Sequence, residues 1–132
     1  MHRWPIRVYY EDTDLAGVVY YANYLRFIER GRTEWVRERG VDQWRLREEE
    51  GLVFAVRKLE ADYHLPARFD DVVEVRTTMV EGSGARVVLE QEIWRDADRL
   101  FSARVTLVAM DALGRPRRIP APLAGSPEAS PA

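Results

Sequence analysis

Two aspartates, Asp12 and Asp14, are separated by a single residue in a segment that joins a strand-like stretch to a long amphipathic stretch. Gly17 and the aromatic residue Tyr21 follow before the amphipathic stretch begins. A carboxylate placed there lies beside the first N–H groups of a helix, which have no partner within the helix and attract negative charge. A carboxylate and such N–H donors together can carry out acyl transfer, because the donors stabilise the oxyanion as it develops.

The two aspartates are expected to differ in their roles. Asp14 fits both a residue that caps its own turn and a catalytic carboxylate. The order of strand, Asp-x-Asp, glycine, aromatic residues and helix favours the catalytic role for Asp14. Asp12 lies nearer the end of the strand, so we expect its side chain to cap the turn. We expect Asn23 to form hydrogen bonds at the start of the helix.

Most other hydrolytic chemistry lacks the residues that it needs. The chain has no cysteine, which excludes disulfides, thiolate nucleophiles and cysteine-bound zinc. A serine–histidine–acid triad would have to use His2 or His64, and there is no Gly-x-Ser-x-Gly motif. A metal would have only carboxylates such as Asp12 and Asp14 as ligands, so we expect no metal and no cofactor. Acidic side chains and backbone amides are left to carry the reaction.

The composition indicates the broad class of protein. With 132 residues, of which 46% are hydrophobic, the chain suits one domain with one core. Its formal net charge of −2 gives no long-range attraction for nucleic acid. No apolar run approaches the roughly 18 residues that cross a membrane, and the first residues contain no signal-peptide core. We therefore expect a cytoplasmic protein that neither binds nucleic acid nor inserts into a membrane.

The amphipathic stretch predicts the helix that positions the aspartate segment. Apolar residues recur at three- and four-residue steps between residues 22 and 39, and Gly40 ends the pattern. Gly31 in mid-helix costs about 1 kcal/mol relative to alanine, which predicts a close backbone approach at that point. A second helix is expected at residues 42–50, with Asp42 as its cap.

Alternating apolar residues predict five strands around the long helix. The strands are expected at residues 3–10, 52–63, 72–81, 86–94 and 100–110. One helix cannot bury itself, so the simplest α+β arrangement wraps the antiparallel sheet around it. We expect this domain to span residues 1–114. An extended or disordered tail is expected at residues 115–132, which hold five of the seven prolines.

Two further sets of apolar and aromatic residues are candidates for surfaces. One set lies on the sheet parity opposite the expected core, and we expect it to form an apolar surface that another subunit covers. The other set fits either an aromatic pocket near the aspartates or the core. The first set is Val72, Val80, Val88 and Trp94, and the second is Tyr20, Tyr24 and Phe27.

The aspartate segment resembles the signature of a known family. Residues 12–24, Asp-Thr-Asp-Leu-Ala-Gly-Val-Val-Tyr-Tyr-Ala-Asn-Tyr, resemble that of the hydroxybenzoyl-CoA thioesterase family of hot-dog proteins. They are most similar to its bacterial acyl-CoA thioesterase branch, which is associated with the Tol–Pal system, and residues 27–34, 56–58 and 63–71 resemble the same branch. The resemblance covers about residues 6–112. It implies a hot-dog fold, hydrolysis of an acyl-CoA thioester to a carboxylate and free CoA, and a homodimer or homotetramer with sites between subunits.

The resemblance also implies roles for four residues. Asp14 matches the essential carboxylate, which is a nucleophile in some members and a general base in others. Tyr21 matches the residue whose backbone N–H polarises the thioester carbonyl, although the bacterial branch usually carries histidine there. Gly17 matches a glycine that lets the loop approach the substrate. Glu29 matches an acid that faces the acyl group, and an ion pair with a neighbouring arginine of the helix is its alternative.

The phosphates of CoA need cations, and the expected strands offer several. Arg57, Lys58 and Arg86 are our candidates for binding CoA, and a solvated side chain is the alternative for each of them. The hydroxybenzoyl enzyme has a basic run beside the corresponding turn, which Gly84-Ala85 interrupts here. A basic cluster at residues 115–118 fits a phosphate, a partner or a solvated end.

Two other functions stay open on the same fold. A hydroxyacyl dehydratase or hydratase needs a histidine–acid pair, for which His64 is the candidate, whereas a structural role would have His64 bond a neighbouring strand. A non-catalytic module that binds acyl groups or scaffolds partners would not need Asp14. The intact Asp-x-Asp and glycine favour the thioesterase over that module.

Overall fold

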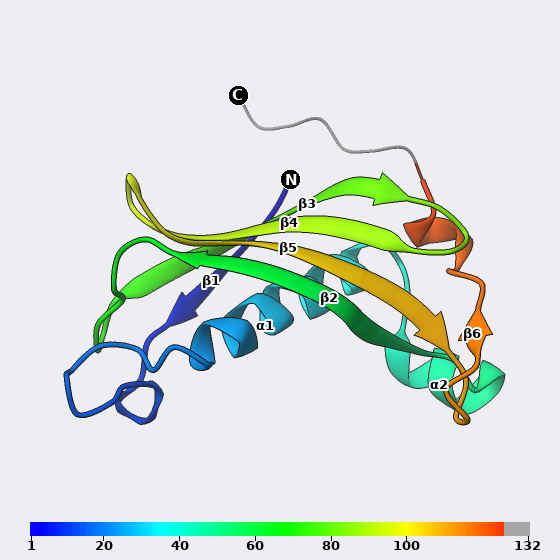
Figure 1. The fold of residues 1–132 in the computed structure, drawn as a ribbon, viewed down its shortest axis with the longest axis horizontal. Helices are drawn as coiled ribbons and strands as arrows, with labels where there is room; N and C mark the ends of the chain where they lie inside the picture. Colours follow the sequence, from blue (N-terminus) through cyan, green and yellow to red (C-terminus); the bar gives the residue numbers. More distant parts are fainter. Residues whose placement is uncertain (126–132) are drawn as a thin grey trace.

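The computed structural model describes residues 1–125 as one curved antiparallel sheet wrapped around a helix (Figure 1). The helices are α1 (Asn23–Glu38) and α2 (Gln43–Glu50). The strands are β1 (His2–Arg7), β2 (Val53–Tyr63), β3 (Val72–Gly82), β4 (Val87–Arg95), β5 (Asp98–Met110) and β6 (Pro116–Arg117). Two 3₁₀ turns cover Tyr10–Asp12 and Ala121–Leu123. The α+β architecture predicted from the element order is therefore confirmed.

The sheet has the strand order β1-β3-β4-β5-β2, with β6 added on β5. Neighbouring strands are antiparallel throughout, and the register aligns Val75, Ile93, Phe101 and Tyr63 in one row across β3, β4, β5 and β2. Residues of one row point to the same face, so this row faces α1. In the described part of the chain, β2 pairs only with β5, which leaves its other edge without a strand.

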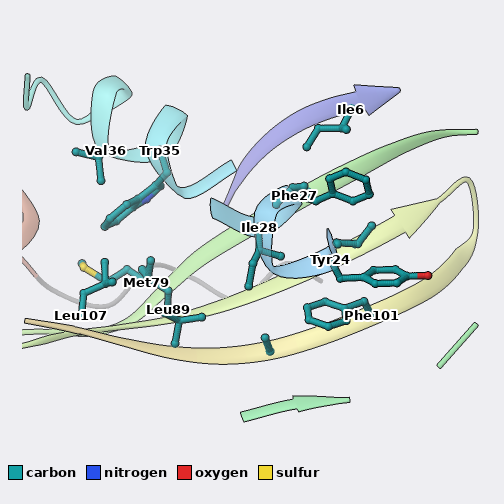
Figure 2. Packing of buried hydrophobic residues seen from close by; sticks show 14 of the residues in the cluster. Ile6, Tyr24, Phe27, Ile28, Trp35, Val36, Met79, Leu89, Phe101 and Leu107 are labelled. Carbon is teal, nitrogen blue, oxygen red and sulfur yellow. The ribbon is translucent and has the colours of Figure 1, made fainter. Parts of the chain in front are cut away.

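Helix α1 buries one face against the sheet. Its buried residues follow three- and four-residue steps, and Figure 2 shows Ile28 and Trp35 directed from α1 toward the sheet. Gly31 meets β3 at the centre of the helix: a Cβ atom on Gly31 would lie 2.3 Å from Cγ1 of Val75. The predicted close approach at Gly31 is thus confirmed, because no side chain fits between α1 and β3 there.

The ends of both helices also follow the predicted signals. Gly40 has a φ of +83°, a conformation that favours glycine just beyond a helix. The Asp42 carboxylate accepts a hydrogen bond of 3.0 Å from the Arg45 N–H and caps α2, as expected. Gly51 follows α2 with a φ of +61°.

The segment that follows β5 differs from the expected tail. Ile119 and Leu123 are 2% and 1% exposed and belong to the hydrophobic core. The Ile119 N–H donates to the carbonyl oxygen of Gly84 at 2.8 Å, so the segment is tied to the β3–β4 turn. The boundary expected after residue 114 is therefore wrong, since residues 116–125 complete the domain. The rest of the expected tail, residues 126–132, lies outside the described residues.

The outer face of the sheet differs from the expected apolar surface. Val72 is exposed, but Val88 is buried within the chain, and Val80 is partly covered. The Arg76 guanidinium covers Trp94, with its Cζ atom 4.4 Å from the ring centroid. Between these residues lie charged side chains that pair across strands, such as Glu90 with Arg104 at 2.6 Å. The expectation of one exposed apolar patch is wrong, because the intervening positions on these strands are charged.

Candidate active site

The loop between β1 and α1 is held together by Asp12. Its carboxylate accepts a hydrogen bond of 2.8 Å from the Tyr9 N–H, which caps the 3₁₀ turn. Its backbone carbonyl accepts two more, from the Tyr20 N–H at 3.0 Å and from the Asn23 side-chain amide at 2.9 Å. The structural roles predicted for Asp12 and Asn23 are confirmed, because together they join the start of the loop to the start of the helix.

Asp14 lies in a tight turn that Gly17 closes. Its Oδ1 accepts a hydrogen bond of 2.9 Å from the Ala16 N–H, and its backbone carbonyl accepts one of 3.0 Å from the Gly17 N–H. Gly17 has a φ of +79°, where other residues are strained. The side chain of Asp14 is exposed, and its Oδ2 has no hydrogen-bond partner in residues 1–125. One carboxylate oxygen therefore caps the turn and the other is free.

Tyr21 sits two residues before α1, with its backbone N–H free. In the described part of the chain, neither the Tyr21 N–H nor the Ala22 N–H has a hydrogen-bond acceptor. The Tyr20 carbonyl accepts from the Asn23 N–H at 2.8 Å, which orients the peptide that carries the Tyr21 N–H. The two free donors lie at the positive end of the α1 dipole, where a developing negative charge is stabilised.

Aromatic side chains surround this helix end. The ring of Tyr21 is exposed and lies 4.8 Å from that of Tyr20, and a hydrogen bond with Tyr21 raises the pKa of the Tyr20 phenol. Tyr24 is buried and stacks on Phe101 with 5.4 Å between ring centroids (Figure 2). Burial raises the pKa of Tyr24, and the charge of Asp14 adds to that rise. Tyr24 is thus a core residue within electrostatic reach of the free carboxylate.

The loop that contains Ala67 and Arg68 supports the aspartate turn. Val18 pairs with Arg68, and the Val19 N–H donates to the Ala67 carbonyl at 2.8 Å. Asp71 holds that loop by accepting from the Arg68 N–H at 2.9 Å and from Arg95 at 2.8 Å. Although burial acts to raise the pKa of Asp71, these hydrogen bonds bring it below its ordinary value.

Glu29 lines a cavity of about 310 Å³ between α1 and β2. In the described chain it forms no ion pair within 4 Å, but its charge acts on the neighbouring Arg32 and raises the pKa of that guanidinium against the effect of burial. Arg32 lines the same cavity, and its guanidinium donates to Gln91 at 2.8 Å. Burial lowers the pKa of Arg32. Gln91 was not predicted to have a role. The pattern that could have indicated one is a polar residue at an inward-facing position of an otherwise apolar strand.

The structure does not gather the expected CoA-binding cations near Asp14. Lys58 pairs with Glu60 at 3.0 Å and Arg86 pairs with Glu81 at 3.1 Å, while Arg57 lies at an irregularity of β2. The row of residues across the sheet that contains Tyr63 lies near the Asp14 loop. At about 3.3 Å per residue along a strand, the three cations lie about 15 to 25 Å from this row. Their role in binding CoA stays a prediction. Beside Arg86, the guanidinium of Arg118 packs over Gly84, a contact that the sequence did not indicate.

His64 bonds a neighbouring strand, as its structural role predicts. Its Nε2 lies 2.9 Å from the Ser102 hydroxyl on β5. Among residues 1–125, no group of three or more histidine, aspartate or glutamate side chains is arranged to hold a metal ion. The same residues include no helix long and apolar enough to span a membrane.

Comparisons with known proteins agree with this fold. The model of the thioesterase-like superfamily matches residues 8–126. The chain is 43% identical to the acyl-CoA thioester hydrolase YbgC of Escherichia coli over 122 residues, which cover 91% of this chain and 90% of that protein. It is also 43% identical to the acyl-CoA thioesterase YbgC of Haemophilus influenzae, over 90% of this chain and 87% of that one.

Among solved structures, the crystal structure of a probable thioesterase from Bartonella henselae superposes with a TM-score of 0.87. That protein is 39% identical to the chain, and the match covers 90% of this chain and 98% of the other. The curved sheet around α1 is therefore a hot-dog fold, and the chain belongs to the thioesterase-like superfamily.

Proposed function

We propose that this protein hydrolyses acyl-CoA thioesters to a carboxylate and free CoA, with Asp14 as the catalytic carboxylate and the Tyr21 N–H as the oxyanion donor. The observation that carries the proposal is the pairing of a free carboxylate oxygen with free N–H groups on one loop. The names of the relatives from Escherichia coli and Haemophilus influenzae support the acyl-CoA substrate.

The reaction suits a site with these few groups. A thiol with a pKa of about 8.5 leaves as a thiolate without strong protonation, so no general acid is required. Two routes are open to Asp14. In the first, its Oδ2 attacks the thioester carbonyl, the CoA thiolate leaves, and water then cleaves the anhydride that has formed. In the second, the carboxylate takes a proton from the water that attacks the carbonyl, and the CoA thiolate leaves. In both routes the carbonyl oxygen becomes negative and is stabilised by the Tyr21 N–H.

Binding of the substrate is assigned to residues around this centre. Gly17 keeps the turn open toward the thioester, and Glu29 faces the acyl group from α1. Arg57, Lys58 and Arg86 bind the phosphates of CoA. All three cations are exposed, Arg57 and Lys58 on β2 and Arg86 in the turn before β4, which supports access to a charged ligand.

We propose further that the protein acts in the cytoplasm as a homotetramer, built from dimers with the active sites between subunits. Asp14 is exposed and its neighbour Leu15 is fully exposed, so the site of one chain lacks a cover. The free edge of β2 carries the exposed apolar residues Val56 and Leu59. An unpaired strand edge beside apolar residues is a surface that a second copy can cover.

The test is release of free thiol from a panel of short, long and aromatic acyl-CoAs. Asp14→Asn keeps an oxygen for the Ala16 N–H but cannot act as a base or nucleophile, so we expect kcat to fall by about 100-fold or more in a folded protein. His64→Ala is the matched control, and we expect it to retain activity. Absence of thiol release, together with dehydration of a hydroxyacyl-CoA that His64→Ala abolishes, would favour the dehydratase. No turnover of any acyl-CoA would favour the binding module. Equal thiol release by Asp14→Asn and the unmodified protein would contradict the catalytic role of Asp14.

A further inference from the structure

Tyr63 links the sheet to the backbone of the site. Its hydroxyl donates a hydrogen bond of 2.9 Å to the carbonyl oxygen of Tyr21, 42 residues earlier in the chain. Tyr63 is the last residue of β2, and its ring packs edge-on against Tyr24 and Phe101 with centroid distances of 5.3 and 5.0 Å. The ring is therefore held by the core while its hydroxyl reaches the loop.

This hydrogen bond completes the support of the Tyr21 backbone. The Asp12 carbonyl and the Asn23 N–H hold the two sides of Tyr20, which fixes the chain before Tyr21. After Tyr21, the Leu25 N–H bonds the carbonyl of Ala22. Among the described residues, the hydrogen bond to the Tyr21 carbonyl comes from Tyr63. Without it, the Tyr21–Ala22 peptide can rotate, and the direction of the free Ala22 N–H changes with it, whereas the Tyr21 N–H belongs to the preceding peptide, which the Asn23 N–H holds.

We propose that Tyr63 is a positioning residue for thioester hydrolysis, whose hydroxyl fixes the Tyr21–Ala22 peptide so that the free Ala22 N–H faces the developing oxyanion beside the Tyr21 N–H. This inference rests on the proposed function, because it adds the Ala22 N–H as a second oxyanion donor beside the Tyr21 N–H. Donors that are held in place before the reaction stabilise the oxyanion without a cost of reorganisation. The phenol keeps its proton at neutral pH, since burial, with the nearby Tyr21 and Tyr24, raises the pKa of Tyr63.

The kinetic test uses Tyr63→Phe, which removes the hydroxyl and keeps the ring in the core. We expect kcat to fall about tenfold with KM unchanged, because the N–H groups act on the transition state rather than on the bound substrate. A rise in KM at unchanged kcat would overturn the inference and indicate that the hydroxyl binds substrate.

A second readout follows the hydrogen bond itself. Tyr21-Ala22 is the only Tyr-Ala pair in the sequence, so labelling tyrosine carbonyls with ¹³C and alanine amides with ¹⁵N gives one correlated NMR signal. In Tyr63→Phe we expect the Tyr21 carbonyl resonance to move upfield, because a carbonyl that loses a hydrogen bond is less polarised. An unchanged resonance would overturn the inference.

Tyr24→Phe is the matched control for loss of a hydroxyl from the same cluster. The Tyr24 hydroxyl accepts a hydrogen bond of 3.0 Å from the Ala67 N–H and does not bond Tyr21. We expect Tyr24→Phe to lower stability and to leave the Tyr21 carbonyl resonance in place. If the unmodified protein hydrolyses no acyl-CoA, the proposed function and this inference fail together. If it does so and Tyr63→Phe has the same kcat, the inference alone is overturned.

Discussion

The side-chain amide of Gln91 on β4 donates a hydrogen bond of 2.9 Å to the backbone carbonyl oxygen of Ile28 on α1. The same amide donates to the Thr77 hydroxyl at 2.9 Å, and its oxygen accepts from Arg32 at 2.8 Å. Gln91 is fully buried, so its bonds to Ile28 and Thr77 are made away from water, whereas its bond with Arg32 is partly buried. The helix is therefore tied to the sheet by a polar contact in the middle of an apolar interface.

Replacing this buried amide should cost stability. In Gln91→Leu we expect the free energy of unfolding to fall by about 1–3 kcal/mol, because the Thr77 hydroxyl and the Arg32 guanidinium lose a partner in the core. Denaturation by urea, followed by circular dichroism, measures the change. Gln43→Leu on the exposed surface of α2 is the control, and we expect it to stay within about 0.5 kcal/mol. Equal stability of the two variants would contradict the role of Gln91.

The contact of Gly31 with Val75 predicts a coupled pair of substitutions. Gly31→Ala gains about 1 kcal/mol of helix propensity but forces a methyl group against Cγ1 of Val75, which costs about 1–3 kcal/mol. We expect a net loss of stability in the single variant. Val75→Ala removes the obstructing methyl groups, so the double variant should be more stable than the sum of the two single changes predicts. Additive changes would show that the helix moves away without strain.

Leu123 should contribute as much to the stability of the fold as a buried residue of the central sheet. It is 1% exposed, and in Leu123→Ala we expect the free energy of unfolding to fall by about 2–5 kcal/mol. Leu113→Ala is the control, since Leu113 is exposed in the loop before β6. Chemical denaturation measures both variants. A Leu123→Ala protein as stable as Leu113→Ala would mean that residues 116–125 are not part of the core in solution.

The hydrogen bonds of Asp71 predict a dependence of stability on acid. Its folded pKa lies below the ordinary value of 3.8, so the carboxylate contributes stability above pH 3.8 and loses that contribution as the pH falls through the folded pKa. We expect Asp71→Asn to unfold more easily than the unmodified protein at neutral pH, and the difference to shrink below pH 3.8. Urea denaturation across this range measures it.

The neighbouring Asp70 provides the control for this pH dependence. Asp70 has a φ of +70°, which asparagine tolerates, and its carboxylate forms an exposed pair with Arg7. We expect Asp70→Asn to change stability little at any pH, because exposed ion pairs contribute little. A stability difference for Asp71→Asn that stays constant down to the lowest pH would contradict the depressed pKa.

Local patterns predicted the helices and most of the sheet, and they failed where distant segments meet. The helix at residues 22–39 and its break at Gly40 follow from spacing and from one glycine, both of which are local. The contact of Tyr63 with Tyr21 spans 42 residues and that of Gln91 with Ile28 spans 63, so no window along the chain contains them. The residues of the Asp14 loop could therefore be predicted from the sequence, whereas the distant residues that hold the loop and the helix in place could not.

The proline-rich segment shows a different reason for failure. Prolines at residues 116, 120 and 122 suggested a tail without a core, since proline lacks the N–H that helices and strand ladders use. They also fix the backbone angle φ, which lowers the entropy lost when Ile119 and Leu123 pack on the sheet. The apolar residues Ile119 and Leu123 indicated that the segment packs on the core, but the proline-rich composition was given more weight.

The position of Ile119 and Leu123 has a consequence for how the protein is made. Both follow all of the long strands in the sequence, and β1 at the start of the chain pairs with β3, about 70 residues later. During synthesis, the apolar surfaces of α1 and the sheet thus emerge before the segment that seals one end of them. Such a nascent chain presents exposed apolar surface for longer than a chain built from local contacts, which makes it a natural client for chaperones.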